Sequence, residues 1–181
     1  MDDTPVFYFD LASPECYLAA ERISELLPVP ADWVPVAGTR AKRSVDRGLI
    51  ERLASERGLQ PVRWPTSWPP QTDLAARAAT YAGSIARVTA FSLAAFRQAF
   101  AGGRDLDDAD TIVIAAAACE IHPAALLRGV GLRSVRLALE QATARAEAAG
   151  VRSLPAIAVG ELVFEGDDGL EGAARSLGDG R

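Results

Sequence analysis

The sequence is poor in the residues from which metal and redox centres are built. Its 181 residues include one histidine, His122, and two cysteines, Cys16 and Cys119. One histidine and two distant cysteines do not complete a zinc site, so we expect no bound metal. We interpret the cysteines as free thiols, because proteins of a reducing compartment rarely keep a structural disulfide.

A basic tail, a signal peptide and a long apolar run are also lacking. The formal net charge of −5 argues against a nucleic-acid partner. The N-terminal segment MDDTPVFYFD is acidic and has no basic region, unlike a signal peptide. No apolar run approaches the roughly 18 residues that a membrane-spanning helix requires. We therefore expect a cytoplasmic protein that binds neither nucleic acid nor membranes.

The chain does have the composition of a globular domain, with 49% hydrophobic and 24% charged residues. Short apolar runs predict strands over residues 6–10 and 33–37, the second at a sheet edge because it contains Pro35. A period-two pattern around Gly160-Glu161 predicts a hairpin of residues 156–159 and 162–164. Helical patterns cover residues 14–27, 46–57, 72–82, 84–101, 110–120, 132–149 and 168–177.

The predicted strands lie at the two ends of the chain. They must join in one sheet, because neither pair is stable by itself. This order predicts an α/β fold whose core is interrupted by a block of helices. We assign residues 1–43 and 132–181 to the core and residues 44–131 to a helical insertion.

The first strand runs into the first helix at Ser13-Pro14-Glu15-Cys16. Ser13 is the natural N-cap, because proline favours the first helical position, and capping alone would account for it. The turn also lies at the carboxyl edge of the sheet, where α/β folds bind ligands. There the helix N-terminus and the Ser13 hydroxyl would together stabilise an anion such as a thiolate.

Cys16 follows Ser13 by three residues, the spacing of a dithiol motif whose outer cysteine is replaced by serine. We expect its thiol to face inward from the helix as a small buried hydrophobic group. A redox role for Cys16 is the alternative.

A second group of candidates follows residue 150. Pro155 begins a strand, which is a permitted position; alternatively, a cis Leu154–Pro155 bond presents the Leu154 main chain to a peptide-like ligand beside Ser13. Asp167 and Asp168 are typical helix caps, or they hold an ammonium group of a ligand at the same edge.

Candidates for substrate contacts lie in the intervening segment. Lys42 belongs to a basic cluster with Arg40, Arg43 and Arg47, which binds a substrate carboxylate or is simply solvated. Trp64 and Trp68, in the loop PVRWPTSWPP, form a lid over a flat substrate or pack the core against the insertion.

Together these segments resemble the DsbA-type thioredoxin fold, in the branch of 2-hydroxychromene-2-carboxylate isomerases and kappa-class glutathione transferases. FYFDLASPECYLA resembles its strand–Ser-Pro–helix opening, and GVRSLPAIAVGELVFEGDDGLEG its cis-Pro hairpin and glutathione-contacting turn. ERGLQPVRWPTSWPPQTDLAARAA and FRQAFAGGRDLDD resemble its central loop and insertion. The chain departs from the branch at Cys16, Gln71 and Gly169, where the branch carries serine, asparagine and a basic residue.

The resemblance implies a thioredoxin-like fold of the DsbA type and glutathione as cofactor. It implies that Ser13 stabilises the glutathione thiolate and that Leu154 pairs with the cysteinyl backbone, with Pro155 beside it in the cofactor-binding loop. It also implies that Asp168, with Asp167 beside it, contacts the γ-glutamyl end. Lys42 is the nearest candidate for a lysine that the branch carries after the second strand. The implied activity is thiolate addition to a small conjugated aromatic substrate, in an isomerase or transferase. We also expect a homodimer.

Two other functions remain open. One is a thiol–disulfide oxidoreductase that acts through Cys16 alone, which the absence of an outer cysteine disfavours. The other is a thioredoxin-fold binding protein without catalytic activity.

Overall fold

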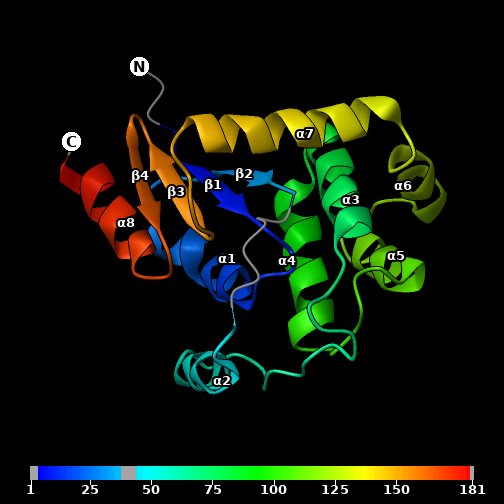
Figure 1. Cartoon of the computed structure of the whole chain (residues 1–181), viewed down its shortest axis with the longest axis horizontal. Helices are drawn as coiled ribbons and strands as arrows, with labels where there is room; N and C mark the ends of the chain where they lie inside the picture. Colours follow the sequence, from blue (N-terminus) through cyan, green and yellow to red (C-terminus); the bar gives the residue numbers. More distant parts are fainter. Residues whose placement is uncertain (1–3, 38–43, 180–181) are drawn as a thin grey trace.

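A four-stranded mixed sheet lies between helices and forms the frame of the molecule (Figure 1). The computed structural model describes residues 4–37 and 44–179. The strands are β1 (Val6–Phe9), β2 (Asp32–Pro35), β3 (Ala156–Val159) and β4 (Leu162–Glu165). Their order in the sheet is β2-β1-β3-β4, with β1 parallel to β2 and antiparallel to β3, and β4 antiparallel to β3.

Helices cover both sides of this sheet. They are α1 (Pro14–Leu26), α2 (Arg47–Glu56), α3 (Asp73–Ser84), α4 (Val88–Phe100), α5 (Ala109–Ala117), α6 (Pro123–Gly129), α7 (Arg133–Ala148) and α8 (Gly169–Asp179). In Figure 1, α7 runs along one side of the sheet, while α1 and α8 lie on the other. Helices α3, α5 and α6 gather at the end of the molecule beyond β2.

The core is built around aromatic side chains that join the sheet to the helices. Phe7 and Phe9 are two residues apart on β1 and therefore share a face, where both contact the Trp33 ring at centroid distances of 4.9 and 5.6 Å. Phe9 also meets Phe96 of α4 at 5.8 Å, and each such pair contributes about 1 kcal/mol beyond the area it buries. Sheet and α4 thus share one hydrophobic core.

Small residues allow the central helices to pack closely. Helix α3 buries five alanines, and α4 and α5 bury further alanines along their contacts. The extreme case is Gly129 of α6, where an added Cβ would come within 2.2 Å of the Tyr81 ring. The alanine-rich composition of this region therefore reflects helix packing distances.

The predicted strands and their union in one sheet are confirmed, and Pro35 lies in the edge strand β2. Two helix boundaries were predicted wrongly. Helix α4 begins at Val88 rather than at residue 84, because Ala86 adopts a φ of 57° that interrupts the helix. Helix α5 ends at Ala117, before Glu120 with its φ of 60°, and the short helix α6 follows. The division into core and insertion stays a prediction.

Candidate functional site

The turn between β1 and α1 places Ser13 at the N-terminus of a helix of 13 residues. Its Oγ accepts the N–H of Cys16 at 3.1 Å, which confirms the predicted N-cap. The same hydroxyl donates to Glu15 Oε2 at 2.9 Å. Ser13 is half-buried, and the partial positive charge of the helix end favours an anion beside it.

Asp10, the last residue of the run VFYFD, is hydrogen-bonded to this turn. It was not among the residues predicted for the site. Its side chain accepts the N–H of Ala12 at 2.9 Å and the hydroxyl of Thr72 at 3.4 Å, while its carbonyl accepts the N–H of Ser13 at 3.0 Å. Burial raises the pKa of this carboxyl, although the hydrogen bonds from Ala12 and Thr72 oppose the rise. Asp10 therefore fixes the Ser13 turn and ties it to the start of α3. The available signal was a carboxylate directly after a buried strand.

Cys16 is inaccessible, as the sequence predicted. Its exposed fraction is 0%, and burial raises the pKa of its thiol far above the ordinary value, against the opposing effect of its hydrogen bond with Ser13. A thiol in this state is protonated at neutral pH and cannot attack a disulfide in solvent. This geometry disfavours the single-cysteine oxidoreductase.

The strand pairing brings the second predicted group to the same edge of the sheet. Because Tyr8 pairs with Ala156 in antiparallel register, the end of β1 adjoins the beginning of β3. Ser13 follows β1, and Leu154 precedes β3, so both lie at this edge. The Leu154–Pro155 peptide is cis, and the Leu154 side chain is buried.

The two predicted aspartates before α8 have different surroundings. Asp167 accepts from the Arg57 guanidinium through both oxygens, one at 3.0 Å, and from Arg22 at 3.2 Å. Arg22 also pairs with Glu171. Asp168 is exposed and forms no ion pair within the described residues. Asp168 is therefore the carboxylate that is available to a ligand, whereas Asp167 links α1, the end of α2 and the start of α8.

The structure also explains why position 169 carries no basic side chain. An added Cβ at Gly169 would lie 2.9 Å from the carbonyl carbon of Phe164, so the start of α8 rests directly on the backbone of β4. In this chain the guanidinium groups beside the turn come from Arg22 and Arg57 instead.

Trp64 and Trp68 pack against each other edge to face at 5.1 Å, and Trp64 contacts Phe100 of α4 at 6.3 Å. The Arg47 guanidinium lies over both indoles, and Trp64 Nε1 donates to Glu51 Oε1 at 2.6 Å. The tryptophans thus join α2 to α4, and their predicted contact with substrate stays a prediction. Lys42, with Arg40 and Arg43, lies outside the described residues.

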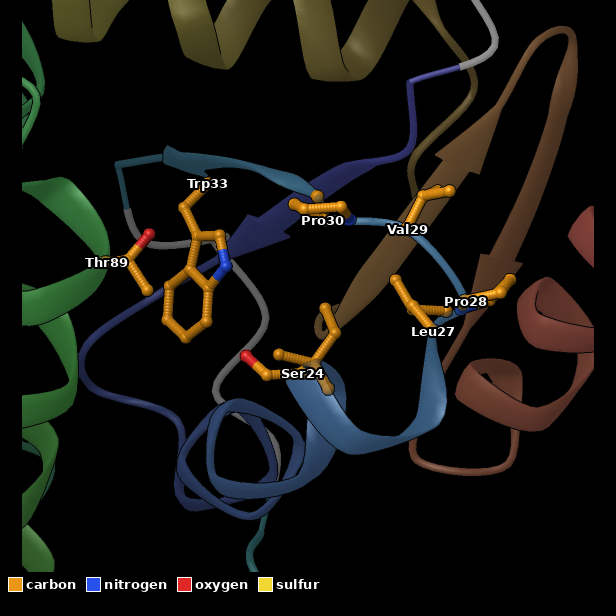
Figure 2. A pocket seen from close by; sticks show the side chains of 9 residues that line it. Ser24, Leu27, Pro28, Val29, Pro30, Trp33 and Thr89 are labelled. Carbon is orange, nitrogen blue, oxygen red and sulfur yellow. The ribbon is translucent and has the colours of Figure 1, made fainter.

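A cavity of about 320 Å³ lies at the opposite edge of the sheet (Figure 2). It is lined by Ile23, Ser24, Leu27, Pro28, Val29, Pro30, Ala31, Trp33 and Thr89. These residues surround the end of α1 and the beginning of β2, whereas Ser13 precedes α1. None of the predicted site residues lines this cavity, so it is separate from the candidate site.

Comparison with known proteins gives one family and several similar structures. Residues 5–178 match the family described as DSBA-like thioredoxin domain. A solved structure of 2-hydroxychromene-2-carboxylate isomerase is 19% identical, with a TM-score of 0.85 over 97% of this chain and 95% of that one. A probable DsbA oxidoreductase from Streptomyces coelicolor is 16% identical, with a TM-score of 0.80 over 97% and 88% of the two chains.

The cytosolic disulfide reductase DsbM from Pseudomonas aeruginosa, solved with GSH, is also 16% identical, with a TM-score of 0.70 over 97% and 99% of the chains. Comparison with curated protein sequences gives no match. At these identities the solved structures establish the fold, which confirms the predicted thioredoxin-like architecture of the DsbA type.

Proposed function

The chain belongs to the family of DSBA-like thioredoxin domains, and we propose that it is a glutathione-dependent isomerase or transferase in which Ser13 stabilises the glutathione thiolate. The observation that carries the proposal is the meeting of two features at one sheet edge. One is a serine hydroxyl at a helix N-terminus, in the place of the outer cysteine of a dithiol motif. The other is the loop with the cis Leu154–Pro155 peptide.

The described residues fit glutathione in three places. Ser13 offers a hydroxyl and a helix N-terminus to the thiolate. Leu154 precedes strand β3 across the cis Leu154–Pro155 peptide, and its main chain offers an N–H and a carbonyl for pairing with a peptide. Asp168 offers a free carboxylate to the γ-glutamyl ammonium group at the start of α8.

When bound, glutathione would supply a thiolate nucleophile for addition to a conjugated aromatic substrate. The protein's own contribution is electrostatic and geometric. The N-terminus of α1 and the Ser13 hydroxyl lower the cost of negative charge at this point, provided that the hydroxyl turns away from Glu15. Asp10 holds the Ser13 turn in place. Trp64, Trp68 and Lys42 are proposed to contact the substrate.

Calorimetric titration with glutathione tests this proposal. We expect the wild-type protein to bind glutathione, and Ser13→Ala to bind it about tenfold more weakly, because one hydrogen bond to a charged group is lost. S-methylglutathione has no ionisable thiol and should bind both proteins equally. Ser24→Ala is the matched control, since Ser24 is exposed on the same helix.

Absence of glutathione binding by the wild-type protein would refute the proposal. Equal affinity of wild type and Ser13→Ala for glutathione would refute the role of Ser13. No helix of the described residues has the length and apolar character needed to cross a bilayer. A cytoplasmic location and a homodimer stay predictions.

A further inference from the structure

The carboxylate of Glu165, the last residue of β4, is surrounded by hydrogen-bond donors from the loop that leads into β3. It accepts the N–H of Arg152, the N–H of Ser153 at 2.8 Å and the hydroxyl of Ser153 at 3.0 Å. Hydrogen bonds to an ionised carboxylate are among the strongest that proteins form. One side chain therefore holds residues 152 and 153 of this loop.

A second contact holds the same loop, through the main chain of Gly166, the residue that follows β4. The N–H of Gly166 donates to the carbonyl of Pro155 at 2.8 Å. Leu154 thus lies between Ser153, which is hydrogen-bonded to Glu165, and Pro155, which is hydrogen-bonded to Gly166. Outside the sheet ladder, no hydrogen bond of the described residues engages the N–H or the carbonyl of Leu154. These main-chain groups are therefore available to pair with the backbone of a ligand.

We propose that Glu165 is a positioning residue that holds the Leu154 main chain in the conformation that pairs with the backbone of glutathione. This rests on the proposed function, which assigns glutathione to the site. A loop that is already in its binding conformation loses less conformational freedom when the ligand arrives, and affinity rises accordingly.

The electrostatics of Glu165 agree with this role. Partial burial opposes its ionisation, but the hydrogen bonds from Arg152 and Ser153 outweigh burial and lower the pKa of the carboxyl. The Arg152 guanidinium is the charged group that faces it, and acts in the same direction. Glu165 is thus a carboxylate, and therefore a strong acceptor, throughout the neutral pH range.

Three variants of the full chain test the assignment, each by calorimetric titration with glutathione and by amide hydrogen exchange without ligand. Glu165→Ala should speed exchange at Ser153 and weaken glutathione binding about tenfold. Glu165→Gln keeps one acceptor oxygen and should lose less on both measures. Glu161→Ala removes an exposed glutamate from the turn of the same hairpin and should change neither.

Faster exchange at Ser153 with unchanged affinity in Glu165→Ala would overturn the assignment, and so would unchanged exchange. If Glu165→Ala does not fold, the comparison of Glu165→Gln with wild type decides by the same criteria. Failure of the wild-type protein to bind glutathione would overturn the proposed function and this assignment with it. Binding by wild type together with unaltered variants would overturn the assignment alone.

Discussion

The Ser13 hydroxyl donates its single proton to Glu15 Oε2 at 2.9 Å while it accepts the N–H of Cys16 at 3.1 Å. A hydroxyl has one proton to donate. A thiolate bound at this helix end must therefore compete with the Glu15 carboxylate for that proton, and the carboxylate also repels it.

Glu15→Gln should consequently lower the pKa of the bound glutathione thiol. The amide accepts the Ser13 proton less strongly and carries no charge. The ultraviolet absorbance of the thiolate, followed against pH in the complex, measures this pKa. Glu25→Gln is the control, because Glu25 is exposed further along α1. An equal thiol pKa in wild type and Glu15→Gln would contradict the competition.

Cys16 should react slowly with thiol reagents in the native protein. Its thiol is fully buried, and burial raises its pKa, so both access and thiolate population are low. In a Cys119→Ala background, labelling at neutral pH should be at least about a hundredfold slower than that of free glutathione. Rapid labelling of the folded protein would instead support the oxidoreductase.

Asp10 should make stability depend on pH. Burial raises its pKa in the folded state above the unfolded value, so its favourable contribution is present below the unfolded pKa and is lost as pH rises through the folded pKa. Asp10→Asn keeps an oxygen for Ala12 and Thr72 and removes the charge. At neutral pH we expect it to be more stable by on the order of 1 kcal/mol, with the difference vanishing in acid.

Chemical denaturation of Asp10→Asn and wild type over a series of pH values measures this difference. A gap between the two proteins that stays constant from acid to neutral pH would show that the Asp10 carboxyl does not titrate as burial requires.

Substitutions of Asp167 and Asp168 should have different effects, the first on the free energy of unfolding and the second on glutathione affinity. Asp167→Ala leaves the partly buried Arg22 and Arg57 without this carboxylate, and we expect a loss of about 1–2 kcal/mol in the free energy of unfolding. Asp168→Ala removes an exposed carboxylate and should leave stability unchanged while weakening glutathione binding. Thermal denaturation and titration distinguish the two, and reversed effects would contradict the assignment of Asp168 to the ligand.

The parts of the molecule that were predictable from sequence are those fixed by neighbouring residues. Ser13 before Pro14 predicted the helix cap, and Pro35 predicted an edge strand, because both follow from local backbone chemistry. The alternation about Gly160 predicted the hairpin for the same reason.

The contacts that were missed join residues far apart in the chain. Arg57 and Asp167 are 110 residues apart, and Arg22 and Asp167 are 145 apart, so nothing local distinguishes these charges from solvated ones. Glu165 faces Ser153 only because the hairpin folds back on the loop before it. Such contacts depend on tertiary placement, which residue spacing alone does not encode.

The pairing of Tyr8 with Ala156 joins the two ends of the chain in one sheet. This contact closes a loop that contains most of the chain. Each doubling of loop length raises the entropic free-energy cost of closing it by only about 0.6 kcal/mol. Helices that form early within the loop shorten the segment that remains to be closed. Ser13 and Leu154 therefore reach the same edge of the sheet only when the C-terminal hairpin docks on β1. A chain still emerging from the ribosome has no candidate site until that step.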